Sequence, residues 1–405
     1  MSEILVIGHR NPDTDAICSA IGYAEFKRRT GMVEAIAARC GDTNDRIDFV
    51  LETFRLPAPK FVADVSPKVA DVMQRKILSV RPDATAADAL RLMDEKNLRI
   101  LPVMDDDRKC HGLLSLFKLS KFLFPAVNRG KNSREILSSL TGLAQTLGGE
   151  LVLGFHSDRE EELILLIGAM GLDSCAARLE QFPSEKLCVL VGDRNDIQNF
   201  AILSSVRVLI VTGGATVDPD ILETALRKRV SVIVSPHDTA TTASLCRASV
   251  PVRHVLNEEF LCFRETAPLM AVREEALSSG YFVFPVLDAE GQTVGILSKT
   301  DFLKTVTRKL ILVDHNELSQ AVLGADEVEI IEIIDHHRIG ALATQQPILF
   351  RNEPVGSTCT IVADCFFRSD VELPGPIAGL LLAGVVSDTL NLTSPTTTAR
   401  DAGIL

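Results

Sequence analysis

Four apolar segments, each followed closely by aspartate or histidine, constrain the fold of this chain most strongly. The first, ILVIG, leads into the stretch HRNPDTD, which contains His9, Asp13 and Asp15. The other three segments follow residue 308: LILV precedes Asp314, VEIIEII precedes the stretch DHH, and AGLLLAGVV precedes Ser387 and Asp388. If all four are parallel strands, their carboxyl ends meet at one edge of a sheet. We therefore expect these acidic and imidazole side chains to converge.

The first sixty residues predict the class of that sheet. A helix is expected from near Asp15 to Gly31, where a cap residue and a glycine mark its ends. The apolar stretch EAIAAR should form the next strand. Strands that alternate with helices indicate an α/β fold with a parallel sheet.

The chemistry of the converging residues indicates a metal site. Several carboxylates placed close together repel one another unless cations lie between them. Mixed carboxylate and imidazole ligands favour manganese, cobalt, iron or zinc over calcium, and the absence of cysteine argues against structural zinc. His9 alone would be read as a cap or core histidine, but the whole set predicts a two-metal centre that activates water for attack on phosphorus. The predicted ligands are His9, Asp13, Asp15, Asp314, His336 and Asp388. His315 and Glu317 are left as outer residues or helix N-terminal residues.

The middle of the chain contains an internal repeat. Residues 69–124 and 252–306 share an extended start, an amphipathic helix, a strand with a Pro-Val pair, and a G-[LI]-L-S strand that leads into a helix. Both copies resemble CBS modules, which bind adenine nucleotides. The resemblance covers about fifty-five residues of each copy.

Between the two copies, residues 187–245 form another alternating α/β pattern. Gly192-Asp193-Arg194 and Thr212-Gly213-Gly214 resemble the DRTGG domain. The glycine turn could present backbone N–H groups to an anion, or it could be a turn without a ligand, and both readings stay open.

Composition excludes several classes of protein. The net charge is −12, which argues against a protein that coats nucleic acid. The longest apolar run, 377–386, is too short to span a bilayer, and the N-terminus has no signal-like segment. Nine cysteines without a CxxC pair predict reduced thiols and a cytoplasmic location.

Together, the stretches HRNPDTDAICSA, VDHNE, IDHHRIG and GVVSDT resemble the four N-terminal-domain motifs of family II inorganic pyrophosphatases, which belong to the DHH phosphoesterase superfamily. The order of motifs resembles the regulated subgroup with an inserted CBS pair and DRTGG domain. The resemblance implies a parallel-sheet α/β DHH domain that is interrupted by this regulatory region. The implied boundaries are 1–63 and 309–405 for the DHH domain, 64–126 and 250–308 for the CBS modules, and 127–249 for the DRTGG domain with its linkers.

The resemblance also implies roles for the site residues. His9 and Asp13 resemble ligands of one metal, Asp15 and His336 resemble ligands of the second, and Asp314 and Asp388 would bridge both. His337 resembles a residue that contacts phosphate and assists proton transfer, so that Asp15, Asp314 and His337 are the implied catalytic residues. The family uses two Mn²⁺ or Co²⁺ per site, with Mg²⁺ accompanying pyrophosphate.

For the CBS modules, the resemblance implies regulation by AMP, ADP, ATP or diadenosine polyphosphates. Ser298, Thr300 and Asp301 in SKTDF would line the second nucleotide site. The first copy has Ser115 and Lys118, with lysine where the second has Asp301; it could meet a phosphate but cannot accept a bond from a ribose hydroxyl. Paired CBS modules also imply a homodimer.

The end of the sequence departs from the family pattern. The chain stops at TTTARDAGIL, whereas family members carry a C-terminal domain that clamps pyrophosphate. We therefore expect a truncated form that binds metals but hydrolyses pyrophosphate slowly, because positioning supplies much of the catalysis of phosphoryl transfer.

Two alternatives to a pyrophosphatase follow from the same residues. A DHH-type phosphodiesterase of short oligonucleotides or cyclic dinucleotides would share the metal chemistry. A non-catalytic adenine-nucleotide sensor would keep the CBS modules and need no active site.

Overall fold

The structure is a computed structural model that describes residues 3–124, 134–304, 306, 308–344 and 346–405. Contacts within the chain divide the described residues into two compact units. Unit 1 comprises residues up to 72 together with 266–278 and 299–405. Unit 2 comprises residues 73–265 and 279–298.

Unit 1 is built on a six-stranded sheet in which every neighbouring pair is parallel. The strand order is β17-β16-β15-β1-β2-β3, so the first strand of the chain lies beside one that begins about 300 residues later. The predicted parallel α/β fold is therefore confirmed. The strands are β1 (Ile4–Ile7), β2 (Ala35–Arg39), β3 (Lys60–Phe61), β15 (Lys309–Val313), β16 (Glu329–Asp335) and β17 (Leu349–Asn352).

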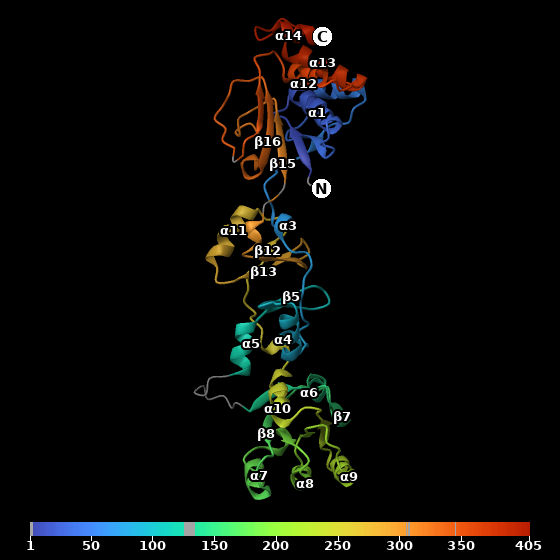
Figure 1. Ribbon diagram of the computed structural model, residues 1–405, viewed down its shortest axis with the longest axis vertical. Coiled ribbons are helices and arrows are strands. Elements are labelled where there is room, and N and C mark those ends of the chain that lie inside the picture. Colours follow the sequence, from blue (N-terminus) through green and yellow to red (C-terminus); the bar gives the residue numbers. More distant parts are fainter. Residues whose placement is uncertain (1–2, 125–133, 305, 307, 345) are drawn as a thin grey trace. The chain divides into compact units, whose positions relative to one another are not determined.

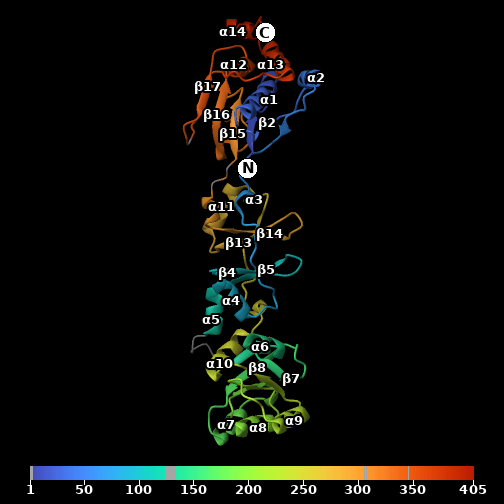
Figure 2. The same ribbon diagram turned by 45° about the vertical axis from the view of Figure 1, so that its right-hand side comes forward.

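Side chains from the two faces of this sheet enter two separate cores. On one face, Val6 and Ile311 pack with α1, α2, α12 and α13, and Figures 1 and 2 show these helices beside the sheet. On the other face, Leu5 and Leu312 pack against the segment that contains Ala321 and Val322. Alternation of the strand side chains therefore gives both faces an apolar cover. The helices of this unit are α1 (Thr14–Arg29), α2 (Asp45–Phe54), α3 (Val69–Val72), α11 (Leu269–Ser278), α12 (Thr358–Arg368), α13 (Gly375–Asp388) and α14 (Ala399–Ile404).

The local signals for α1 are confirmed within one or two residues. Asp13 is the N-cap, and its carboxylate accepts the N–H of Ala16 at 2.9 Å. Lys27, Arg28 and Arg29 occupy the last turn, where cations interact favourably with the helix dipole. The helix ends at Arg29, two residues before the predicted stop at Gly31.

In unit 2 the two repeats each provide an antiparallel strand pair, β4 with β5 and β13 with β14, and β12 pairs with β13. Two expectations were wrong. The predicted extended starts are the short helix α3 and a 3₁₀ turn at Val252–His254. The helix expected after the second G-I-L-S strand is, among the described residues, a 3₁₀ turn at Asp301–Leu303. The elements of unit 2 in this region are α4 (Ala86–Glu95), β4 (Ile100–Met104), β5 (Cys110–Ser115), α5 (Leu116–Leu123), β12 (Phe263–Arg264), β13 (Val283–Leu287) and β14 (Thr293–Ser298).

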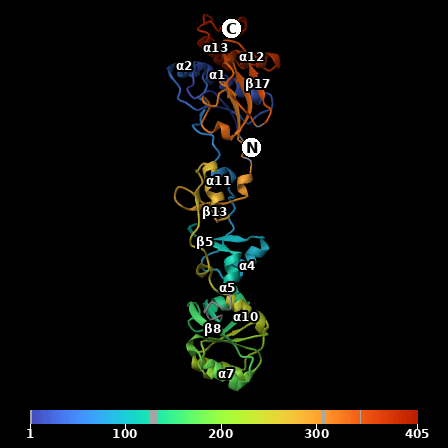
Figure 3. The same cartoon turned by 90° about the vertical axis from the view of Figure 1, so that its left-hand side faces the viewer.

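A second six-stranded sheet, also in unit 2, has the order β6-β8-β9-β10-β11-β7. Its central strands, β8 to β11, are parallel; the alternating pattern of residues 187–245 predicts β9 to β11, and β8 precedes that pattern. Helices α7, α8 and α9 contribute to the core on one face, and α6 and α10 to the core on the other (Figure 2; α7 and α10 are also labelled in Figure 3). The elements are β6 (Glu135–Ser138), α6 (Leu140–Leu147), β7 (Glu150–Leu153), β8 (Glu161–Ile167), α7 (Leu172–Leu179), β9 (Leu187–Val191), α8 (Asn195–Leu203), β10 (Val208–Val211), α9 (Pro219–Lys228), β11 (Ser231–Val234) and α10 (Thr239–Ala248).

Two further expectations concern the chain as a whole. Among the helices that the structure describes, none is long and apolar enough to cross a membrane. The predicted boundary between residues 126 and 127 lies outside the described residues.

Candidate metal centre

The loop between β1 and α1 carries the predicted ligands His9 and Asp13, and Asp15 lies in the first turn of α1. Asp13 has a half-exposed side chain whose Oδ1 lies 3.7 Å from His9 Nε2. His9 Nε2 also lies 3.4 Å from Asp314 Oδ2, at the end of β15. Asp13 therefore caps α1 and also lies beside His9 in the cluster.

Asp314 is the residue on which the cluster centres. It follows β15 directly, it is 1% exposed, and its φ of 63° is in the left-handed region. Aspartate tolerates this conformation better than most residues, but such backbone strain is characteristic of functional sites. Its Oδ2 is buried and has no hydrogen-bond partner among the described residues.

His336, which directly follows β16, lies close to three carboxylates. Its Nε2 lies 3.4 Å from Asp314 Oδ1, 3.4 Å from Asp388 Oδ2 and 3.9 Å from Asp15 Oδ2. Its Nδ1 lies 3.0 Å from the carbonyl of Val355, to which it donates. This contact orients the ring and turns Nε2 toward the carboxylates, as the outer partners of metal-binding histidines do.

The position of Asp388 corrects one expectation. The segment AGLLLAGVV is not a strand: it belongs to helix α13, and Asp388 is the last residue of that helix. A helix that packs on α1 therefore brings this carboxylate to the cluster. The other strand ends do belong to parallel strands.

The described residues contain three groups of side chains whose ligand atoms lie within 4.8 Å of one another. All six predicted metal ligands occur in them, and Asp314 and His336 each belong to two groups. Asp388 belongs to one group, with Asp15 and His336, and its bridging of two ions stays a prediction. The groups are His9, Asp13 and Asp314; Asp15, His336 and Asp388; and Asp314, His336 and His337.

Crowding of like charges perturbs these groups strongly. Burial, together with the charges of Asp314 and Asp388, raises the pKa of Asp15 well above its ordinary value. Burial and the charge of Asp314 raise the pKa of Asp388 to about 6. Burial lowers the pKa of His9 and of His336, but bonds to and charges of the neighbouring aspartates outweigh it and raise each to about 10. The cluster of aspartates and histidines therefore retains positive charge, as protons or as cations.

His337 differs from the six because its side chain is half exposed. Its Nδ1 lies 2.9 Å from Asp335 Oδ1, and Nδ1 is also 3.9 Å from Asp314 Oδ1. The buried Asp335 also accepts the backbone N–H groups of His336 and His337. The sequence analysis gave Asp335 no role, although it precedes the two histidines directly.

His315 and Glu317, which were not predicted as direct ligands, lie outside all three groups. The Nδ1 of His315 contacts the carbonyl of Val313 at 2.9 Å, and its buried Nε2 has no partner among the described residues. Glu317 lies near Arg338, with 3.9 Å between Oε1 and Nη2. Neither residue belongs to a group, although the ring of His315 lies edge to face with that of His9, with 6.4 Å between the centroids.

The residues that surround Asp15 were not predicted from the sequence. Ser357, Thr358 and Cys359, at the start of α12, all donate hydrogen bonds to its carboxylate. In the sequence these residues indicate only a helix start.

Comparison with known proteins agrees with this geometry. Residues 3–385 match the model of the DHH family, N-terminal domain. The chain belongs to the DHH family. Its relatives include the cobalt-dependent inorganic pyrophosphatase of Clostridium perfringens, 36% identical over 403 residues, which cover 98% of this chain and 72% of the relative. The probable manganese-dependent inorganic pyrophosphatase of Thermotoga maritima is 35% identical over 404 residues, which cover 99% and 72%.

A solved structure resembles the middle of this DHH-family chain. It is the crystal structure of the CBS and DRTGG domains of the regulatory region of the C. perfringens pyrophosphatase, complexed with the activator diadenosine tetraphosphate. It is 28% identical, has a TM-score of 0.51, and covers 57% of this chain and 99% of the solved chain. The predicted family resemblance and the α/β fold with this regulatory region are thus confirmed.

The residues predicted to contact nucleotide fall in both units of the DHH-family chain. Ser115 caps α5 by accepting the N–H of Lys118, and Lys118 Nζ donates to Asn257 Oδ1 at 2.9 Å. Asp301 is 3% exposed and pairs with Lys304 at 2.8 Å. Ser298 ends β14 in unit 2, and Thr300 precedes the 3₁₀ turn in unit 1.

The glycine turn after β10 does not leave its N–H groups open to an anion. The N–H of Gly213 donates to the carbonyl of His237 at 2.7 Å, and that of Gly214 donates to the carbonyl of Ser235 at 2.8 Å. Both glycines have positive φ, which explains the residue type without a ligand. The structure therefore favours the turn without a ligand.

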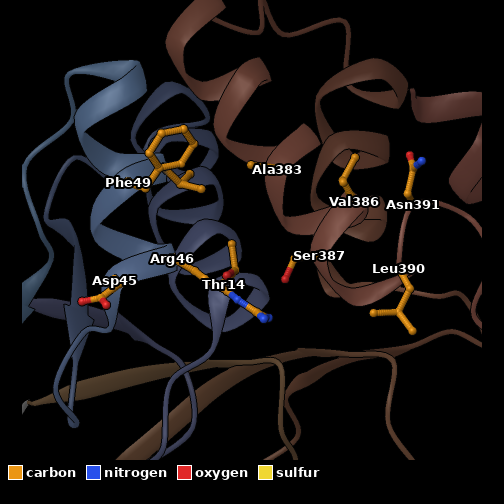
Figure 4. A pocket seen from close by; sticks show the side chains of 10 residues that line it. Thr14, Asp45, Arg46, Phe49, Ala383, Val386, Ser387, Leu390 and Asn391 are labelled. Atoms are coloured by element: carbon orange, nitrogen blue, oxygen red, sulfur yellow. The ribbon is translucent and has the colours of Figure 1, made fainter.

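A pocket of about 770 Å³ lies in unit 1 between α2 and the end of α13. Figure 4 shows Arg46 and Phe49 on one side of it and Val386 and Leu390 on the other. Thr14 and Ser387 also line it, and each is adjacent in sequence to a predicted metal ligand. The wall is mostly apolar, with the Arg46 guanidinium as its cation.

Proposed function

We propose that this chain hydrolyses inorganic pyrophosphate to two phosphates at a centre of two Mn²⁺ or Co²⁺ ions. The observation that carries the proposal is a pair of buried atoms at the middle of the cluster, His336 Nε2 and Asp314 Oδ2, which have no hydrogen-bond partner among the described residues. Relatives named as cobalt- or manganese-dependent pyrophosphatases support the choice of substrate and ion.

The residues present fit such ions. Ligand atoms that each lie about 2.1 Å from one ion are roughly 3–4 Å from one another. The separations that His9 Nε2 and His336 Nε2 make with the carboxylate oxygens fall between 3.4 and 3.9 Å. Imidazole and carboxylate donors are also the ligands that these ions accept.

In the proposed centre, His9 and Asp13 would hold one ion, Asp15, His336 and Asp388 would hold the other, and Asp314 would be available to both. When bound, the ions activate a water molecule and neutralise charge on the phosphate oxygens. His337 stands at the exposed rim, oriented by Asp335, where its ring can contact a phosphate and carry a proton. Mg²⁺ accompanies the substrate in this proposal.

The CBS modules supply the proposed regulation. The related regulatory region was crystallised with diadenosine tetraphosphate as its activator, which supports adenine-nucleotide binding here. Ser115 and Lys118 would contribute to nucleotide binding in the first module, and Ser298, Thr300 and Asp301 in the second. Homodimer formation through the CBS modules and a cytoplasmic location stay predictions, as do the domain boundaries.

Phosphate release from pyrophosphate, together with Mn²⁺ binding by equilibrium dialysis, tests the proposal. We expect two ions per chain and a phosphate release that D314N abolishes. Absence of Mn²⁺ and Co²⁺ binding, or cleavage of a dinucleotide in preference to pyrophosphate, would overturn the proposal, and the second result would favour the phosphodiesterase.

A further inference from the structure

The start of α12 forms a set of donors around one predicted ligand, Asp15. The Ser357 hydroxyl donates to Asp15 Oδ1 at 2.6 Å, the N–H of Thr358 donates to Oδ2 at 2.7 Å, and the N–H of Cys359 donates to Oδ1 at 3.0 Å. All four residues are buried. The carboxylate thus occupies the N-terminus of an eleven-residue helix, where the helix dipole stabilises negative charge.

Thr358 makes a second contact that its neighbours do not make. Its hydroxyl donates to Asp314 Oδ1 at 2.9 Å. Among the described residues, Thr358 alone donates to both carboxylates. Its N–H and its hydroxyl belong to one rigid, β-branched residue, so they fix the position of Asp15 relative to that of Asp314.

Capping of the helix does not explain this hydroxyl. Ser357 is already the N-cap of α12, and its side chain accepts the N–H of Cys359. Thr358 is the next residue, and its hydroxyl points away from the helix backbone toward Asp314. A side chain without a hydroxyl would serve the helix equally well.

Asp401, near the end of the described chain, binds residues on both sides of Thr358. This buried carboxylate accepts the N–H of Gly356 at 2.9 Å and the hydroxyl of Thr360 at 2.6 Å. Donors on either side of Thr358 are therefore fixed to α14. The loop cannot move without breaking these buried bonds, each of which would leave an unpaired polar group.

We propose that Thr358 is a positioning residue of the metal centre, which holds Asp15 and Asp314 at the spacing that two ions require. Its two bonds use one lone pair on each carboxylate and leave Asp314 Oδ2 free to face His9. Without the hydroxyl, Asp314 could rotate, and ion binding would have to restore its orientation at the expense of affinity. This role rests on the metal centre proposed above.

The test compares T358V, T358S and wild-type protein by calorimetric titration with Mn²⁺ alone. Valine keeps the shape of the side chain and removes the hydroxyl, whereas serine keeps the donor. We expect T358V to bind Mn²⁺ about 10–100-fold more weakly, which is typical when an outer partner of a ligand is lost. T358S should stay close to wild type, and the Co²⁺ absorption spectrum should change in T358V only.

Thr242 provides a matched control. It is also buried and hydroxyl-bonded, to Ser235 at 2.9 Å, but it lies in unit 2. T242V should leave the Mn²⁺ affinity unchanged. If T358V fails to fold by circular dichroism, the smaller T358A removes the same hydroxyl without adding bulk.

The outcomes separate this role from the proposed function. Equal Mn²⁺ affinity of a folded T358V or T358A and of wild type would overturn the role of Thr358 and leave the metal centre intact. A wild-type chain that binds no Mn²⁺ would overturn both. Weaker binding in T242V as well would show a general effect of losing a buried hydroxyl, and it would also overturn the specific role.

Discussion

Substitution of Gly384 by alanine tests how closely α13 must approach the metal centre. Gly384 lies one turn before Asp388, where α13 crosses α1 and α12. A Cβ atom added there would be 2.4 Å from Cys359 Sγ and 3.2 Å from both Asp15 Oδ1 and Cys18 Cβ. The first distance is far below van der Waals contact. Alanine therefore requires α13 or the start of α12 to shift.

The cost of this shift can be bounded. Cys359 is fully buried and is fixed by backbone bonds to Asp15, so its sulfur has no space to move into. Overpacking of a close-packed core costs about 1–3 kcal/mol. Alanine also favours a helix over glycine by about 1 kcal/mol, which offsets part of this cost. Gly403 in α14 provides the control, because a Cβ there meets nothing within 4 Å.

Native-state hydrogen exchange, read by mass spectrometry on peptides from α1 and α12, measures the opening free energy of unit 1 alone. We expect G384A to lower it by about 1–3 kcal/mol relative to G403A. Because Asp388 lies four residues further along α13, G384A should also weaken Mn²⁺ binding, and G403A should not. Equal protection in the two variants would refute the close-approach argument.

Three further predictions concern the proposed ligands. Saturating Mn²⁺ should stabilise unit 1 against urea, by about 4 kcal/mol for each bound ion at a thousandfold excess over its dissociation constant, and removal of the ions by a chelator should reverse this. H336Q should bind one Mn²⁺ per chain instead of two in equilibrium dialysis, since the three carboxylates that face His336 lose their shared imidazole; two ions bound with unchanged affinity would contradict its assignment. Without metal, the pKa values of His9 and His336 lie at about 10, above the ordinary value of 6.5. Their stabilisation is complete below pH 6.5 and is lost as the pH rises toward 10, so the urea midpoint of the metal-free protein should fall between pH 7 and pH 9, and an increase would contradict the assignment.

Much of the site was predictable because its signals are local. Apolar strands that end in aspartate or histidine can be read directly, and parallel pairing places their ends at one edge. Asp388 joins the cluster, but the expectation of a strand before it was wrong. The segment AGLLLAGVV is apolar on all sides, and periodicity cannot distinguish a buried helix from a buried strand. Its length, as part of a fourteen-residue helix, was the better signal.

Other features depend on tertiary contacts and have no local signal. Thr358 reads as an ordinary residue at a helix start, and only the approach of α12 to Asp15 and Asp314 gives its hydroxyl a partner. The glycine turn shows the opposite case. Its sequence suggests exposed N–H groups, but the neighbouring turn around Ser235 and His237 satisfies them.

The pairing of β1 with β15 explains how a site can be divided by a long insertion. Ile4 is opposite Lys309 in the register of β1 and β15. The predicted ligands in the loop after β1 therefore lie at the same edge of the sheet as Asp314. Within unit 1, the segments that contain Val65 and Arg308 are bonded to each other, because Arg308 Nη1 donates to the carbonyl of Val65 at 2.8 Å. The N–H of Val65 also donates to the carbonyl of Leu323 at 2.9 Å. Arg308 directly precedes β15, whose other end carries Asp314. A displacement of Arg308 and Val65 would therefore act on β15, which pairs with a strand on each side. Such a displacement could reach Asp314 only if β15 moved as a whole.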